Sequence, residues 1–367
     1  MKNEDRCEPN EKASACCCSP SDAATQNSSD AGGKGATGTV TSSLTLGDHL
    51  GAWKVRWSIG RANYKVVPGL YALGNPGPDS PVLTSANYKL SFDVLRSSLP
   101  GIDAWLLVLD TKGINVWCAA GKGTFGTAEL VKRIAVTGLA DVVSHREVVV
   151  PQLGAPGVAA HEVLKGSGFR VRYGPVRAAD LPEYLSAGNK ATPAMRRVGF
   201  GLVERLKIAP VEFVGALRIA AIVCVAIVIL SGLGWDGFSF PRLLSVGLPS
   251  ALMFLVTAVA SAFLAPALLP WLPGRAFALK GLWLGLGAAA AAWAVTQSLP
   301  ALAPLTLGAV AWFFILPTLT SFIAMGYTGA STYTSLSGVL KEMRIAVPLQ
   351  LAGTLVGITL WFAGRFF

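Results

Sequence analysis

Five long apolar stretches in the second half of the chain restrict its possible folds more than any other feature. They lie near Ala216–Trp235, Leu244–Leu268, Lys280–Leu299, Ala303–Met325 and Ile345–Ala363. Each is close to the roughly 20 apolar residues that a helix needs to cross a bilayer, and buried helices of a soluble protein rarely give such a series. The chain is 52% hydrophobic and 14% charged, and it is predicted to contain an all-α transmembrane domain of five spans over residues 213–367.

Basic residues are concentrated on one side of these predicted spans. They are Lys190, Arg196, Arg197, Arg205 and Lys207 before the first span, Arg275 and Lys280 in the second gap, and Lys341 and Arg344 in the fourth. Cytoplasmic loops of membrane proteins carry an excess of lysine and arginine. We therefore expect a multi-pass protein of the cytoplasmic (inner) membrane whose N-terminal half lies in the cytoplasm. This asymmetry accounts for much of the net charge of +10, so no nucleic-acid partner is expected.

Residues 1–43 are rich in small and polar residues and lack apolar periodicity, which predicts a disordered tail. The tail contains Cys7 and the run Cys16-Cys17-Cys18. In a reducing cytoplasm these cysteines are expected to be free or metal-bound rather than paired in disulfides. Adjacent thiols either capture a thiophilic ion such as Hg(II) or Cu(I) or have no specific role, and both interpretations stay open.

Residues 44–189 alternate between short apolar runs and segments with helical spacing. The expected strands are Val82–Leu83, Trp105–Leu109, Val116–Cys118, Asp141–Val143, Val148–Val150 and Phe169–Val171, and the expected helices are Tyr88–Ser97, Thr127–Thr137, Val158–Lys165 and Leu181–Ser186. This alternation predicts a Rossmann-like α/β domain around a mostly parallel sheet. Residues 190–212 are expected to connect it to the first span as a basic linker on the membrane surface.

Cys118 lies between an expected strand and a glycine-rich helix start, in the run Asn115-Val116-Trp117-Cys118-Ala119-Ala120-Gly121-Lys122. Ligands of open α/β sheets bind beyond the carboxyl ends of the strands. A thiolate held there would serve as a nucleophile or as a ligand to a soft metal, and the alternative is an inert core thiol.

Several other site chemistries are not supported. Val116 stands where a phosphate-binding loop ending at Gly121-Lys122 needs a glycine. The histidines lack metal-ligand spacing, and Asp48-His49 does not fit the Asp-x-His-x-x-Gly loop by which many cobalamin proteins supply a histidine to cobalt.

The octapeptide Asn115–Lys122 closely resembles the cap-helix signature of the corrinoid membrane proteins that methylate mercury in anaerobic microbes. The corrinoid-binding region that this family shares with the large subunit of the corrinoid iron–sulfur protein resembles four segments of this chain: Gly74–Pro76, Asp79–Pro81, Thr84–Tyr88 and Phe92–Asp93. The segment before the family's last span is matched by Ser331–Gly338 with Lys341–Arg344. The similarity runs from about Trp53 to the C-terminus and leaves the cysteine-rich tail outside.

The resemblance implies a corrinoid (cobalamin) cofactor and a methyltransferase activity that converts Hg(II) to methylmercury. Cys118 is implied to be the catalytic residue, ligating cobalt from the lower face, where its thiolate favours release of the methyl group to an electrophile. The cap over the corrin is implied to be shaped by the other residues of the octapeptide: Asn115, Val116, Trp117, Ala119, Ala120, Gly121 and Lys122. The edge of the corrin is implied to lie near Thr84, Asn87 and Tyr88.

The family also implies partners: a folate-linked methyl donor, Hg(II) as substrate, and a small ferredoxin with two 4Fe–4S clusters as electron donor. The polar segment Ser331–Ser337 is expected either to dock the soluble domain or the ferredoxin, or to be a simple loop. Two alternatives stay open: a corrinoid methyltransferase with another metal, a metalloid or a thiol as acceptor, and a membrane transporter with a cytosolic thiol domain.

Overall fold

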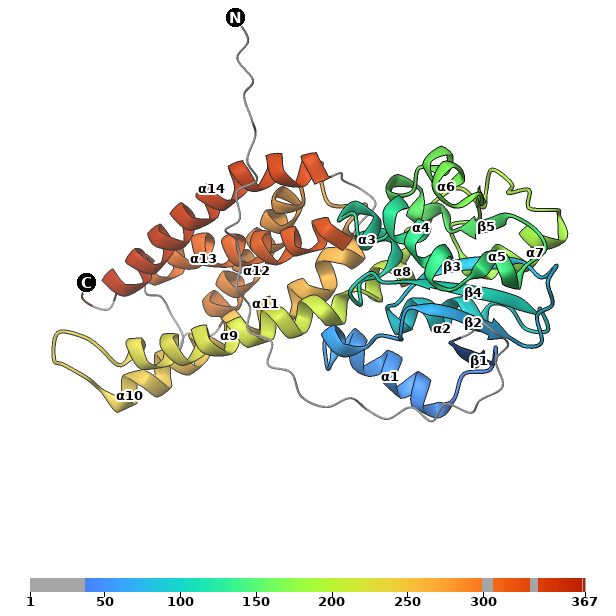
Figure 1. Cartoon of the computed structure of the whole chain (residues 1–367). Helices are drawn as coiled ribbons and strands as arrows, with labels where there is room; N and C mark the ends of the chain where they lie inside the picture. The colour runs from blue at the N-terminus through green and yellow to red at the C-terminus, as the bar shows by residue number, and fades with distance from the viewer. Residues whose placement is uncertain (1–36, 299–305, 331–335, 365, 367) are drawn as a thin grey trace, which may run out of the picture.

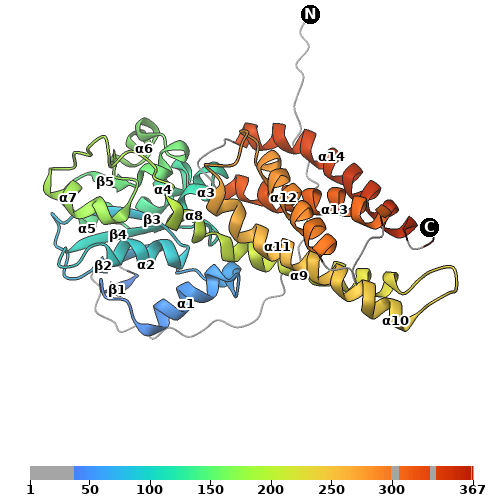
Figure 2. The same cartoon turned by 180° about the vertical axis from the view of Figure 1, so that it is seen from behind.

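The structure is a computed structural model that describes residues 37–298, 306–330, 336–364 and 366. Figure 1 shows an α/β half at one end of the molecule and a bundle of long helices at the other, and Figure 2 shows the same arrangement from behind. Cys7, Cys16, Cys17, Cys18 and the segment 331–335 lie outside the described residues, so their predicted roles stay predictions.

Six strands form one sheet in the order β1-β2-β4-β3-β5-β6. They are β1 (Gly38–Val40), β2 (Gly69–Leu73), β3 (Val82–Ala86), β4 (Ala104–Leu109), β5 (Glu147–Val150) and β6 (Arg170–Tyr173). Neighbouring strands are parallel except for the antiparallel pair of β2 and β4. The predicted α/β fold with a mostly parallel sheet is thereby confirmed.

Helices cover both faces of this sheet (Figure 1). They are α1 (Leu46–Arg56), α2 (Lys89–Ser97), α3 (Val116–Gly121), α4 (Thr127–Val136), α5 (Leu139–Val142), α6 (Ala160–Ser167) and α7 (Leu181–Ser186), with short 3₁₀ turns η1 (Arg61–Asn63), η2 (Gln152–Gly157) and η3 (Ala178–Asp180). Every residue of β4 is buried, and alternate residues face opposite sides of a strand. Leu107 and Leu109 join the core beneath α3, α4 and α6, whereas Leu106 and Val108 join the core beneath α2 and α7.

Two of the predicted strands are wrong. Val116–Cys118 lies inside α3, because the Asn115 side chain accepts a hydrogen bond from the Cys118 amide (2.9 Å) and caps a helix start. Asp141–Val143 overlaps α5, which follows Gly138 in a left-handed conformation (φ 59°). Conversely, β1 and β2 were not predicted, and β1 falls among residues that the sequence analysis assigned to the tail.

A network of charged side chains joins α1 to α2. Asp48 and Asp93 bind both Lys89 and Arg96, and the Arg96 guanidinium lies 2.8 Å from a carboxylate oxygen of each. Asp48 also closes a capping box with Thr45 at the start of α1. Burial works to raise the pKa of Asp48, but hydrogen bonds from Lys89, Thr45 and Arg96 outweigh it and hold that pKa well below its ordinary value.

The described part of the second half contains five helical segments that are long and apolar enough to cross a membrane: Leu202–Ser231, Phe240–Leu268, Phe277–Val295, Gly308–Gly329 and Gly338–Ala363. They comprise α8 (Leu202–Leu206), α9 (Ala209–Ser231), α10 (Phe240–Arg242), a π-helical turn η4 (Leu243–Gly247), α11 (Leu248–Leu268), α12 (Phe277–Ser298), α13 (Thr306–Gly326), a turn η6 (Tyr327–Ala330) and α14 (Leu336–Ala363). The predicted transmembrane spans are thus confirmed by length and composition.

The linker ahead of the first span is fastened to the helical bundle. Arg205 of α8 is buried, and its guanidinium donates hydrogen bonds to the carbonyl oxygens of Pro266 (3.1 Å) and Ala267 (2.9 Å). These oxygens belong to the last turn of α11, where carbonyls have no partner within their own helix. The segment α8 therefore packs against the end of α11, and its predicted location on the membrane surface stays a prediction.

Two glycines bring α12 and α13 into close contact. A Cβ atom added to Gly281 would lie 2.4 Å from the carbonyl oxygen of Thr320, and one added to Gly285 would lie 2.3 Å from the Cα of Pro317. Glycines four residues apart form one face of a helix, and in membranes such faces let helix backbones approach closely.

Replacing Asp48 with asparagine is expected to lower the free energy of unfolding by about 3 kcal/mol at pH 7, because Lys89 and Arg96 lose one partner of a mostly buried ion pair. The stabilisation from a carboxylate with a lowered pKa is complete above its ordinary pKa of about 4 and is lost as the pH falls towards the folded-state value. Asp48→Asn should therefore lose less stability than the wild type on acidification. Thermal unfolding of the solubilised chain measures both effects.

Asp141→Asn, at an exposed site, is the control. An equal loss of unfolding free energy in Asp141→Asn would contradict the prediction.

Gly285→Ala is expected to destabilise the helical bundle by roughly 1–3 kcal/mol, because the new methyl group overlaps the α13 backbone. Gly287→Ala provides the matched control, since a Cβ at that position would meet nothing within 4 Å beyond its chain neighbours and its own helix backbone. Unfolding of the solubilised protein in denaturant compares the two variants. Equal stabilities would show that α12 and α13 are not in close contact at Gly285.

Candidate functional site

A pocket of about 440 Å³ lies at the carboxyl ends of β3 and β5, between the α/β half and the start of the first membrane helix. Its walls come from α2, from the first turn of α3, and from Lys207, Ile208 and Val211. Figures 1 and 2 show α3 and α8 together at the junction of the two halves. The pocket therefore occupies the edge of the sheet where α/β folds bind ligands, and the membrane half completes it.

The structure brings some of the sequence-predicted site residues together and separates others. Thr84, Tyr88, Asn115, Val116 and Trp117 line the pocket, whereas Asn87, Cys118, Ala119, Ala120, Gly121 and Lys122 do not. Ala119 and Ala120 are buried in the core of the α/β half, and Gly121 and Lys122 are exposed at the far end of α3. The octapeptide thus contributes its first three residues to the pocket wall.

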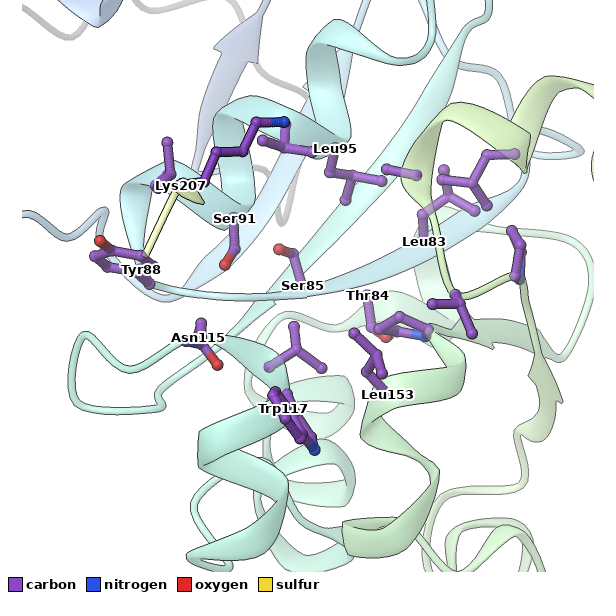
Figure 3. A pocket seen from close by; sticks show the side chains of 18 of the residues that line it. Leu83, Thr84, Ser85, Tyr88, Ser91, Leu95, Asn115, Trp117, Leu153 and Lys207 are labelled. Atoms are coloured by element: carbon purple, nitrogen blue, oxygen red, sulfur yellow. The ribbon is translucent and has the colours of Figure 1, made fainter. Parts of the chain in front are cut away.

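The strand side of the pocket carries hydroxyl groups. The Thr84 hydroxyl donates a hydrogen bond to the carbonyl oxygen of Val149 (3.0 Å), which ties β3 to β5 where they are buried. Figure 3 shows the hydroxyl groups of Ser85 and Ser91 pointing into the space between α2 and α3, with Trp117 opposite. Apolar walls with a few convergent polar groups are typical of small-molecule sites.

Asn87 does not face the pocket but fixes the turn that leads into α3. Its buried Oδ1 atom accepts hydrogen bonds from the Thr111 amide (3.1 Å), the Thr111 hydroxyl (2.8 Å) and the Gly113 amide (2.9 Å). Its Nδ2 atom donates to Asp110 (3.2 Å). One amide side chain on the strand edge therefore holds residues 110–113 in place.

Cys118 is half-buried and is a free thiol, as is Cys224 within α9. It is the third residue of α3, and the Asn115 cap fixes the helix start ahead of it. The helix also packs closely on η2, because a Cβ at Gly157 would lie 3.2 Å from the Cα of Ala120. The thiol is thus carried on a short capped helix, and the two helix residues before it, Val116 and Trp117, line the pocket.

Three basic residues of the pocket were not predicted. They are Arg56 at the end of α1, Arg61 in η1, and Lys207 between α8 and α9. The Arg61 guanidinium lies over the Tyr88 ring, 5.6 Å from its centroid. The sequence signal for α1 was present as the capping box of Thr45 and Asp48, but nothing in the sequence shows that three separate segments meet at one pocket.

Tyr88 is the one pocket residue with a buried polar atom that lacks a hydrogen-bond partner among the described residues. Burial raises the pKa of its hydroxyl, against the opposing effect of Arg61 and Arg56. A buried hydroxyl without a partner costs free energy, and a ligand with acceptor groups would remove that cost.

These residues fit a large amphiphilic cofactor better than a bare metal ion. The described residues contain no group of three or more His, Cys, Asp or Glu side chains that could hold a metal. A soft metal bound by Cys118 would therefore need further ligands from a cofactor. The apolar walls, the hydroxyl groups and the unpartnered Tyr88 hydroxyl suit a corrinoid, whose ring is broad and apolar and whose rim carries amides.

Comparisons with known proteins concern the α/β half of the chain. Residues 59–182 match the protein family described as the CO dehydrogenase/acetyl-CoA synthase delta subunit. The match covers the pocket strands and α3, and it ends before the membrane helices.

Curated relatives are acetyl-CoA decarbonylase/synthase complex gamma subunits. The subunit of Methanopyrus kandleri is 38% identical over 128 residues, which are 34% of this chain and 27% of the relative. That of Archaeoglobus fulgidus is 35% identical over 127 residues, with the same shares. That of Methanocaldococcus jannaschii is 39% identical over 92 residues, 24% of this chain and 19% of the relative. The α/β half is related to these subunits, and the chain spans about a quarter of the length of the first two.

Asn87→Ala is expected to loosen the turn at residues 110–113 and α3 with it. The amides of Thr111 and Gly113 lose their acceptor, and each unsatisfied buried group costs about 1–3 kcal/mol, whereas the Thr111 hydroxyl keeps the Ile114 carbonyl oxygen (2.7 Å). Hydrogen exchange followed by mass spectrometry should show faster exchange across residues 110–121 than in the wild type. Asn75→Ala, at an exposed asparagine, should leave that exchange unchanged. Unaltered exchange in Asn87→Ala would show that the turn is held by other contacts.

Proposed function

We propose that this protein is a corrinoid-dependent methyltransferase of the cytoplasmic membrane that passes a methyl group to Hg(II) and forms methylmercury. The observation that carries the proposal is the half-buried Cys118 on a capped, rigid helix beside a pocket at the carboxyl edge of the sheet. The relationship of residues 59–182 to acetyl-CoA decarbonylase/synthase subunits supports corrinoid-dependent methyl transfer in general. The resemblance of Asn115–Lys122 to the mercury-methylating family supports the acceptor.

The roles of the chain's own residues follow from their positions. Cys118 would hold the cofactor as its lower-face ligand, and Asn115 fixes the helix that carries the thiol. Val116 and Trp117 provide an apolar wall that excludes water, while Tyr88 would donate its free hydroxyl to a ligand amide. When bound, the corrinoid supplies a cobalt-held methyl group.

The thiol of Cys118 supports the proposed acceptor. As a thiolate it would be a stronger electron donor to the cofactor's metal than a histidine nitrogen. The cofactor would then supply a methyl group suited to an electrophile such as Hg(II). Most corrinoid methyltransferases send the methyl group to a nucleophile instead.

We further propose the division into a tail, a cytosolic corrinoid-binding domain that ends at residue 189, a linker (190–212) and a membrane domain (213–367). The domain begins with β1 (Gly38–Val40) rather than at residue 44, because that strand pairs with β2. The electron donor would be a small ferredoxin and the methyl donor a folate-linked compound. The described residues contain no cysteine cluster that could hold iron and sulfur. In this proposal the reducing equivalents come from the ferredoxin partner.

Cys118→Ala is expected to abolish methylmercury formation and to leave the protein inserted and folded, because α3 is held by Asn115 and by packing rather than by the thiol. Cys118→His should keep the corrinoid but slow methyl transfer, since imidazole is the weaker donor. Assays on membranes with a methylated corrinoid and Hg(II), other metals or thiols as acceptors measure both variants.

Cys224→Ala is the matched control, because that thiol lies in α9, where it donates to the Ala251 carbonyl oxygen (3.3 Å). The visible spectrum of the purified protein should show corrinoid bands that shift on replacement of Cys118 but not of Cys224. Wild-type turnover by Cys118→Ala would refute the role of the thiolate. A faster reaction with another acceptor would assign the protein to that substrate.

A further inference from the structure

The pocket beside α3 has an unbalanced charge. Arg56, Arg61 and Lys207 all line it, and among the described residues no carboxylate does. None of the three forms an ion pair within 4 Å in the described part of the chain, although other arginines of this half are paired, as Arg96 is with Asp48 and Asp93. Cations that line a partly enclosed, mostly apolar space without a carboxylate among the lining residues favour binding of an anion there.

Two acidic residues lie close to Lys207 along the chain, and neither lines the pocket. Glu204 forms an ion pair with Arg177 (3.2 Å). Glu212 follows Val211 directly and interacts electrostatically with Arg61. Its carboxylate, however, lines a separate cavity of about 460 Å³ against α13, where it abuts Gly326. The first turn of α9 therefore separates the basic pocket from the acidic side chain.

The three cations come from elements that fix their positions. Arg61 lies over the Tyr88 ring, and α1, which ends at Arg56, is locked to α2 by the Asp48 network. Lys207 follows α8, which Arg205 fastens to the end of α11. In Figure 3, Lys207 extends beside α2, and its amino nitrogen lies at the end near Leu95. The basic group is thus built by both halves of the molecule.

We infer that Arg56, Arg61 and Lys207 form a binding site for a phosphodiester anion. Two guanidinium groups and an ammonium group, with the Ser91 hydroxyl, offer more donors than a planar carboxylate can accept, whereas a tetrahedral phosphate accepts from several directions. The apolar walls suit a diester, which carries organic groups on both sides and a single negative charge.

Two ligands would bring this chemistry to the pocket. One is the phosphodiester in the nucleotide tail of a corrinoid, which would need a binding site of its own if Cys118 were the lower-face ligand. This assignment of the ligand rests on the proposed function. The other is an anionic phospholipid headgroup, because Lys207, Ile208 and Val211 belong to the start of a candidate membrane span. Both sources share the phosphodiester group.

The test compares the full-length chain with Arg56→Gln, Arg61→Gln and Lys207→Gln, singly and combined. Lys54→Gln is the matched control, since Lys54 is an exposed cation of α1 that does not line the pocket. One arm titrates cobalamin, which has the phosphodiester tail, and cobinamide, which lacks it, by visible spectroscopy. The other arm reconstitutes each variant in vesicles of phosphatidylcholine and phosphatidylglycerol, and measures the phosphatidylglycerol retained after extraction in mild detergent.

If the nucleotide tail of the corrinoid occupies the site, the wild type and Lys54→Gln should bind cobalamin at least about tenfold more tightly than cobinamide, as expected for one charged hydrogen bond. The combined variant should then bind cobalamin and cobinamide with equal affinity. If a lipid occupies it, the combined variant should lose retained phosphatidylglycerol while its corrinoid affinities stay unchanged. Wild-type behaviour of the combined variant in both arms would overturn the inference. Absence of binding of either corrinoid to the wild type would refute the proposed function, and the lipid arm alone would then decide.

Discussion

The hydrogen bonds of Asn87 are the interaction on which the site of this protein depends. A single buried oxygen accepts from three donors and thereby fixes the turn between β4 and α3. Asn115 then caps α3, and the tight contact between Ala120 and Gly157 fixes its other side. Because buried polar groups are costly when unpaired, these contacts define one position for the helix and hence for Cys118.

The two halves of the chain are held together by specific side-chain contacts as well as by the covalent linker. Arg205 satisfies carbonyl oxygens that α11 cannot pair itself, and the same segment supplies Lys207 to the pocket. Trp57, directly after α1, also packs against Phe213 of α9, with ring centroids 5.8 Å apart. The α/β half is therefore oriented on the membrane helices, so that the edge of the sheet carrying α3 faces them.

The sequence predicted the parts of this architecture that depend on long or continuous apolar patterns. The five spans and the central strand β4 were found because their residues are apolar almost without interruption. Val116–Cys118 was mistaken for a strand because the polar side chain that decides its structure, Asn115, acts through a hydrogen bond that hydrophobicity does not reveal. The three-residue β1 is too short to give any periodic signal.

The candidate site was predictable only in part, for a related reason. Thr84, Tyr88 and Asn115–Trp117 were identified and do share a pocket, but Ala119 and Ala120 pack into the core, and Asn87 supports a turn instead of a ligand. Arg56, Arg61 and Lys207 stand in three segments, two of them about 150 residues from the third. Only the tertiary fold brings these three residues together, so no local pattern in the sequence predicts that they share a pocket.

One wall of the pocket consists of Lys207, Ile208 and Val211, at the threshold of the first membrane helix. That wall exists only when α8 and α9 have taken their places against α11. A pocket that needs residues from both halves of the chain is complete only where the two halves are packed together. Cutting the chain between them would therefore remove one wall of the pocket as well as the membrane helices.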